Sequence, residues 1–197
     1  AAGIPDFRGP DGLWTRHPGA EKMATISYYM EDADIRRAAW RRRVQLFGSS
    51  PQPTAGHRAL VDFEQRGSLI GLATQNVDGL HHLAGSDPSL VHEVHGTLRV
   101  AHCTTCRTEW PIDELLDRVR AGDDDPSCTE CGGIVKPSVV FFGEMLPRGA
   151  LEASMAAASQ CDVLLAVGTT LGVSPINNRS EEHTSELQSH SFISYSV

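Results

Sequence analysis

The sequence predicts an α/β fold with a parallel sheet, and three observations support this prediction. Short apolar runs at residues 69–73, 91–94 and 163–167 alternate with stretches of helical pattern, as in chains whose strands are joined by helices. The first and last runs are apolar throughout, which is typical of parallel strands covered on both faces. Each run ends at a polar or glycine-rich group, and ligands of parallel sheets bind at the carboxyl ends of the strands.

Helices are predicted in the first third of the chain. Residues 1–12 are rich in glycine and proline and read as an extended loop. Helical material is expected over 19–47, which lies between a Pro-Gly pair and a Gly-Ser-Ser-Pro segment. A second helix is expected over 54–66, with Thr54 as N-cap and Gly67 just past its end.

The remaining elements follow the same reasoning. A helix is predicted over 112–120, an extended apolar segment over 134–142, an alanine-rich helix over 151–158 and a strongly apolar strand over 163–167. The last stretch, 179–197, has no useful apolar period. It reads as a non-native tail and is left out of the fold prediction.

Size and charge narrow the class of protein. The 197 residues are 40% hydrophobic and 21% charged, which is ordinary for one globular domain, or one domain with an insert. The net charge of −8 argues against a nucleic-acid-binding surface across the whole molecule. The one basic run, residues 36–43, is interpreted as a solvated helix face rather than a phosphate-binding patch.

Cellular location is predicted from what the sequence lacks and from its cysteines. No apolar run approaches the roughly 18 residues of a membrane span, and no signal peptide opens the chain. Five cysteines is an odd number of which four fit a metal site, so a reducing cytoplasm is expected. Cys161 is interpreted as a small core residue rather than a reactive thiol.

Four cysteines form two matched pairs, Cys103-x-x-Cys106 and Cys128-x-x-Cys131, with 21 residues between the pairs. Each pair can place two thiolates on one side of a tight turn, and two such turns close a tetrahedron around Zn²⁺. Four thiolates leave no open position for water, so the predicted zinc is structural. The alternative is a set of four buried or free thiols.

Polar residues at the predicted strand ends are the candidate active site. Gln75, Asn76 and Asp78 offer amides and a carboxylate that suit a hydroxyl-rich or amide-bearing ligand. Equally, they can form an Asx-type turn that caps the next helix. His95 follows the second run and precedes a glycine, where an imidazole suits general-base work, although a lone histidine is often structural.

The third strand end is glycine-rich. Gly168, Thr169 and Thr170 follow the run at 163–167. Their backbone N–H groups can face a phosphate or a ribose. Alone, this is a weak indication of a ligand site.

Taken together, these residues resemble the sirtuins, the NAD-dependent protein-lysine deacylases. The resemblance runs from Gly3 to about Pro175. It rests on the following motifs: Gly3-Ile4-Pro5-Asp6-Phe7-Arg8-Gly9, Thr74-Gln75-Asn76-Val77-Asp78-Gly79-Leu80-His81, His95-Gly96, the four cysteines, Val139-Val140-Phe141-Phe142-Gly143-Glu144, and Gly168-Thr169-Thr170.

The resemblance implies a fold and its division into domains. A Rossmann-type domain would bind NAD through residues 1–9, 67–98 and 136–178. A small lobe would be inserted into it, with a helical module at 10–66 and a zinc-binding module at 99–135.

The resemblance also implies residue roles. His95 would be the general base that activates a ribose hydroxyl of NAD. The substrate, an acylated-lysine protein, would pair as a strand with Val139, Val140, Phe141, Phe142 and Gly143. The residues expected to contact NAD are Gly3, Ile4, Asp6, Phe7, Arg8, Gln75, Asn76, Asp78, Gly168, Thr169 and Thr170.

The implied reaction removes an acyl group from lysine and yields nicotinamide and O-acyl-ADP-ribose. Ala38 stands where acid-preferring relatives carry a tyrosine, so a neutral acyl group such as acetyl is expected. The family's first strand, its Gly-Ala-Gly loop and its last elements are missing from this sequence, which reads as a fragment. Two alternatives stay open: ADP-ribosyl transfer or NAD hydrolysis on the same scaffold, and a non-catalytic zinc-containing binding module.

Overall fold

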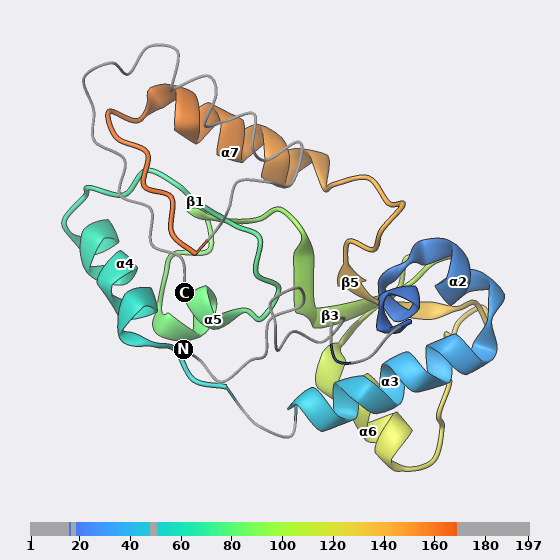
Figure 1. Cartoon of the computed structure of the whole chain (residues 1–197). Helices are drawn as coiled ribbons and strands as arrows, with labels where there is room; N and C mark the ends of the chain where they lie inside the picture. Colours follow the sequence, from blue (N-terminus) through green and yellow to red (C-terminus); the bar gives the residue numbers. More distant parts are fainter. Residues whose placement is uncertain (1–15, 17–18, 48–50, 169–197) are drawn as a thin grey trace.

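A computed structural model describes residue 16 and residues 19–47 and 51–168 of the chain. Within these residues lie two small sheets and their helices (Figure 1). The parallel sheet lies near the centre of the view, close to α4, α5 and α7. The second sheet lies beside α2, α3 and α6.

The parallel sheet consists of β1 (Leu72–Thr74) and β2 (Val91–Glu93), with Leu72 opposite Val91. The short helix α5 (Leu80–Ala84) lies between them in the chain, and α4 (Ala55–Gln65) packs against α5. Helix α7 (Arg148–Gln160) packs against both strands. A Cβ on Gly71 would lie 2.6 Å from Cβ of Ala157, so the close approach of α7 depends on this glycine.

The second sheet is antiparallel, with strand order β4-β3-β5. Its strands are β3 (Gly96–Cys103), β4 (Glu109–Pro111) and β5 (Val135–Val139), and α6 (Ile112–Arg120) follows β4. The chain leaves the parallel sheet after β2, builds this sheet, and returns to the parallel sheet with α7. The antiparallel sheet is therefore an insertion, as expected for the small lobe.

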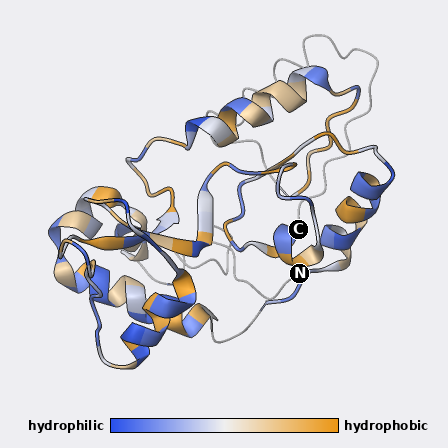
Figure 2. Cartoon of the chain, turned by 180° about the vertical axis from the view of Figure 1, so that it is seen from behind, coloured by the Kyte–Doolittle hydropathy of each residue, from blue (hydrophilic) through white to orange (hydrophobic). Residues whose placement is uncertain are grey.

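Helices from the N-terminal part of the chain cover this insertion. They are η1 (Ala20–Ala24), α2 (Ile26–Glu31) and α3 (Ala33–Phe47). Trp40 of α3 is fully buried in one core with Leu115 and Leu116 of α6 and Val135 of β5. Hydrophobic and hydrophilic stretches alternate along these helices (Figure 2), as expected for helices with one buried face.

The basic run of α3 is only partly a solvated face. Arg36 donates from Nε to both carboxylate oxygens of Asp125 at 3.0 Å, and these side chains are only 13% and 21% exposed. Arg37 pairs more loosely with Asp124 at 3.4 Å. Arg43 is half-buried, with its guanidinium carbon 5.4 Å from the Trp40 ring centroid. The prediction of a solvated face is therefore wrong for Arg36 and Arg43, because the acidic turn at 123–125 and the core reach them.

The predicted strand at 163–167 is wrong for the described residues. Residues 163–166 have no strand pairing, and Val167 forms only an isolated bridge. Val163, Leu165 and Val167 are 69%, 53% and 60% exposed. A strand exists through hydrogen bonds to a neighbouring strand, and an apolar sequence does not by itself supply one. The first run is also displaced: β1 begins at Leu72, and Ile70 is 49% exposed.

The other expected elements lie close to their predicted places. Helix α6 has the predicted bounds, and α7 extends the predicted helix at both ends. The helical material at 19–47 is divided among η1, α2 and α3. Among the helices of the described residues, none has both the length and the apolarity needed to cross a membrane.

We predict that Leu115→Ala destabilises the protein by about 2–5 kcal/mol, because it leaves a cavity between α3 and α6. Urea unfolding, followed by circular dichroism, measures the change. The exposed neighbour Glu114, changed to alanine, is the matched control and should shift the free energy of unfolding by less than about 0.5 kcal/mol. Equal effects of the two substitutions would contradict the proposed core.

Candidate functional site

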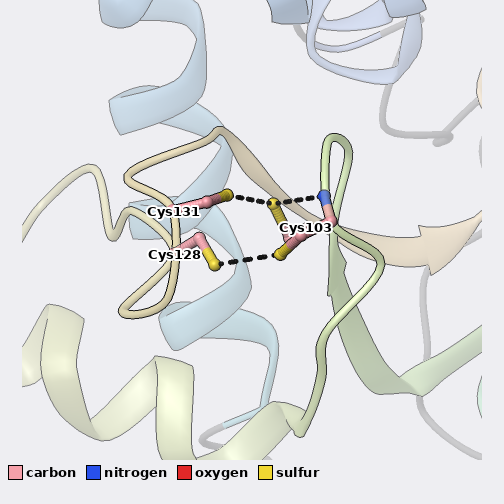
Figure 3. A group of neighbouring side chains, drawn as sticks. Cys103, Cys128 and Cys131 are labelled. Atoms are coloured by element: carbon pink, nitrogen blue, oxygen red, sulfur yellow. Dashed lines mark hydrogen bonds between the residues drawn. The ribbon is translucent and has the colours of Figure 1, made fainter.

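The four paired cysteines lie together at one end of the antiparallel sheet. Their sulfur atoms all lie within 4.8 Å of one another. Sγ of Cys103 is 3.5 Å from Sγ of Cys131, and Sγ of Cys106 is 3.5 Å from Sγ of Cys128. Figure 3 shows the sulfur atoms of the three labelled cysteines pointing toward one another. The two pairs have therefore converged on one point, as predicted.

Tight turns aim these sulfur atoms inward. The N–H groups of Thr105 and Cys106 point at Sγ of Cys103, at 3.4 and 3.5 Å. In the second turn, Gly132 donates to the carbonyl of Cys128 and has a φ of 70°. Only glycine adopts this left-handed conformation readily. Each turn thus places two sulfur atoms on one side of the backbone.

The cluster fits a zinc ion. Four sulfur atoms at about 2.3 Å from Zn²⁺ lie about 3.8 Å from one another in a tetrahedron, close to the separations seen. Hydrogen bonds from Thr108 lower the pKa of Cys106 to about 6. The N–H of Gly133 lowers the pKa of Cys131, but the neighbouring Cys106 and Cys103 sulfurs outweigh it and raise that pKa to about 12. Four thiolates this close repel one another, so a cation between them is needed to keep all four deprotonated.

His95 lies at the other end of β3, two residues after the end of β2. Its Nδ1 is 3.2 Å from the carbonyl oxygen of Gln75. A carbonyl only accepts, so Nδ1 carries the proton in the neutral ring and Nε2 keeps its lone pair. Burial lowers the pKa of His95, and the hydrogen bond to Gln75 opposes this only partly. The imidazole is therefore neutral at pH 7 and able to accept a proton at Nε2.

The backbone around His95 is tightly held. Gly96 has a φ of 75°, and a Cβ at this position would collide with the carbonyl oxygen of Ser138 on β5. The N–H of Val140 donates to the carbonyl of His95 at 2.8 Å. One contact comes from β5 and the other from the residue directly after it, so β5 and its extension set the position of His95.

Gln75, Asn76 and Asp78 follow β1, as predicted, and Gln75 is joined to His95 through its carbonyl. The hydroxyl of Thr74 accepts from the N–H of Asn76 at 3.1 Å, and Oδ1 of Asp78 accepts from the N–H of Leu80 at 2.8 Å. The Asx-type turn therefore exists. It uses one oxygen of Asp78, and the ligand interpretation can coexist with it.

The remaining predicted contacts to NAD are described incompletely. Gly168 is exposed and has a φ of 64°. Seven of the predicted residues lie outside the described residues: Gly3, Ile4, Asp6, Phe7, Arg8, Thr169 and Thr170.

The predicted peptide-binding segment, residues 139–143, crosses from β5 toward η1 and α2. The backbone of Phe142 already pairs with this chain, because it donates to Ala24 and accepts from Ile26 at 2.8 and 3.0 Å. Phe141 is 3% exposed, whereas Phe142 is 44% exposed. Successive side chains therefore face opposite sides, as in an extended strand.

Sequence reasoning missed the buried Lys136 within this region. Its side chain is 3% exposed and lies 3.0 Å from the carboxylate of Glu144. The only signal in the sequence was a lysine inside the apolar stretch at 134–142.

The chain has clear relatives. A family model described as the Sir2 family matches residues 1–175. "NAD-dependent protein deacetylase 2" of Streptomyces coelicolor is 48% identical over 174 residues, which cover 88% of this chain and 72% of that protein. "NAD-dependent protein deacylase 2" of Pyrobaculum aerophilum is 42% identical over 88% of this chain and 66% of its own length.

Solved structures have the same fold. One described as "Structural Basis for the Mechanism and Regulation of Sir2 Enzymes" has a TM-score of 0.84 at 32% identity, covering 99% of this chain and 75% of its own. Another, "Sir2-p53 peptide-NAD+", has a TM-score of 0.81 at 26% identity, covering 98% of this chain and 75% of its own. These similarities support the predicted Rossmann-type parallel sheet with its inserted lobe.

We predict that the purified protein contains one zinc per chain. Cys128→Ala should abolish zinc binding and lower the stability, because a closed four-thiolate site loses a ligand. Metal analysis and thermal unfolding measure both effects. Cys161→Ala is the matched control, since Cys161 lies outside the cluster, and it should keep the zinc. A wild-type protein without zinc would contradict the assignment.

Proposed function

Because this chain belongs to the Sir2 family, we propose that it removes acetyl groups from protein lysine in a reaction that consumes NAD. The products would be deacetylated lysine, nicotinamide and O-acetyl-ADP-ribose. The observation that carries the proposal is the neutral, oriented His95 beside the polar turn after β1. The chain spans about two thirds to three quarters of the length of the relatives described above.

His95 would act as the general base. Its Nδ1–H is held by the carbonyl of Gln75, so the ring orientation is set before substrate binds. Nε2 would accept the proton of a ribose hydroxyl, which makes that oxygen a nucleophile toward the acyl carbon. The lowered pKa supports this role, because a protonated imidazole cannot accept a proton.

The polar turn would hold the nicotinamide end of NAD. Asn76 and Asp78 would bind the nicotinamide amide together with Ile4 and Asp6, and Gln75 would contact ribose or phosphate. Phe7 would shield the reactive ribose carbon, and Arg8 would bind phosphate. The adenosine side would be contacted by Gly168, Thr169 and Thr170. The polar turn after β1, which the carbonyl of Gln75 joins to His95, supports these roles.

The protein substrate would bind along residues 139–143. Its acetyl-lysine would lie close to His95, because the N–H of Val140 in this segment donates to the carbonyl of His95. Phe142 already pairs with Ala24 and Ile26, so the substrate would use the remaining backbone groups of the segment. The net charge of −8 argues against a nucleic-acid-binding surface across the whole molecule. Four cysteines that fit a metal site support a reducing cytoplasm as the location of the reaction.

The domain boundaries follow from the same proposal. The NAD-binding domain would comprise 1–9, 67–98 and 136–178, and the small lobe 10–66 and 99–135. The cysteines, far along β3 from His95, would stabilise the lobe without taking part in the chemistry.

We predict that His95→Ala lowers NAD-dependent deacetylation of an acetyl-lysine peptide by about 10²-fold or more, because the base is removed. The zinc content should stay unchanged. Liquid chromatography of the peptide, with parallel assay of nicotinamide, measures the loss. Retention of most activity would refute the base assignment, and nicotinamide release without acetyl-lysine would instead indicate NAD hydrolysis or ADP-ribosyl transfer.

The pH profile offers a second prediction. The base works in its neutral form, and burial lowers the pKa of His95 below the ordinary value of 6.5. The value of kcat/KM should therefore rise with pH through an acidic limb centred below pH 6.5 and be level near pH 7. Steady-state rates across pH 5–8 measure this limb. A limb centred above pH 7 would contradict the environment described for His95.

A further inference from the structure

Lys136 is a charged side chain at a core position. It lies on β5 between Val135 and Pro137, both of which are buried, and only 3% of the lysine is exposed. Lysine is almost never buried this deeply unless its ammonium group has partners. The contacts of its ammonium group explain why Lys136 can be buried at this position.

The ammonium group of Lys136 has three partners. Nζ donates to the carbonyl of Val139 at 2.9 Å and to Oε2 of Glu144 at 3.0 Å. It also lies 4.5 Å from the centroid of the Phe141 ring, within the range of a cation–π contact. Val139 and Phe141 belong to the segment that is proposed to bind the peptide, and Glu144 directly follows it.

Glu144 extends the same connection. Its Oε2, which accepts from Lys136, also accepts from the N–H of Phe141 at 2.7 Å. The N–H of Glu144 donates back to the carbonyl of Phe141 at 3.0 Å. One ion pair thus holds a carbonyl at Val139 and an N–H at Phe141, two residues apart in the same segment.

The residue between these two points leads to the proposed base. Val140 donates its N–H to the carbonyl of His95 at 2.8 Å. Because Val139 and Phe141 are both held by charged groups, Val140 has little freedom to move away from His95. The ion pair is therefore connected to His95 through a single backbone residue.

We propose that Lys136 and Glu144 are positioning residues, which hold residues 139–141 in the conformation that receives the acetyl-lysine peptide beside His95. This inference rests on the proposed deacetylase function. It adds that peptide binding depends on an ion pair between the buried Lys136 and the partly exposed Glu144, which does not itself have to touch the substrate.

Substituting both residues separates positioning from stability. Removing Glu144 alone leaves the buried ammonium group of Lys136 uncompensated and destabilises the fold, whereas replacing an ion pair with apolar groups of similar size is often neutral. Lys136→Met combined with Glu144→Leu should therefore restore most of the stability lost in either single variant. The double variant still leaves the Val139 carbonyl and the Phe141 N–H without their charged partners.

The experiment compares the full chain with this double variant. We expect the KM for an acetyl-lysine peptide to rise about tenfold or more, with the KM for NAD changed by less than about twofold. Amide hydrogen exchange at Val140 and Phe141 should accelerate about tenfold or more, while exchange within α6 stays unchanged. Replacing Arg118 by Met and Asp123 by Leu, which removes a more exposed ion pair in the zinc-binding lobe, is the control and should change neither quantity.

Each outcome is decisive. The inference would be overturned if the double variant regained its stability and kept the peptide KM and the exchange rates of the wild type. The ion pair would then be purely structural. A wild-type chain without acetyl-lysine-dependent turnover would refute the proposed function instead. In that case the exchange rates of Val140 and Phe141 alone decide whether the ion pair holds the segment.

Discussion

The pairing of β3 with β5 is the constraint on which the rest of the molecule depends. At one end of the pair, Cys103 lies opposite Val135, and the zinc-binding turns extend from there. At the other end, Gly96 lies opposite Val139, next to His95 and to the proposed peptide segment. Eight residues of strand place these ends roughly 23 Å apart. One ladder thus carries the metal site and the candidate active site, and keeps them separate.

Much of the site could be predicted from the sequence because its chemistry is local. The cysteine spacing implied convergence, and His95 was placed correctly after a strand. Lys136 could not be predicted, because a lysine gives no sign of burial until its partners, Val139 and Glu144, are brought to it by a turn. Strand β3 was missed for a similar reason. It joins two motifs and has mixed burial, so neither alternation nor a continuous apolar run marks it.

The error at 163–167 has the opposite cause. Its apolar residues are typical of a buried strand, but strand formation requires a partner, and the described residues supply no ladder there. Helices were easier to predict than strands, since α6 satisfies its own hydrogen bonds and needs only one apolar face. The contact of Arg36 with Asp125 lay beyond local reasoning, because 89 residues separate the two in the chain.

The register of β3 against β5 shifts between Gly96 and Ala101. On the far side of this irregularity, Ala101 and His102 are paired with both β4 and β5, and Cys103 is paired with β5. On the near side, the ladder continues only as Gly96 opposite Val139. An irregularity of this kind interrupts the regular hydrogen bonding between the two strands. Local unfolding that begins at the cysteine turns must cross this break in the ladder before it reaches His95. The two ends of the β3–β5 pair can therefore open as separate cooperative units.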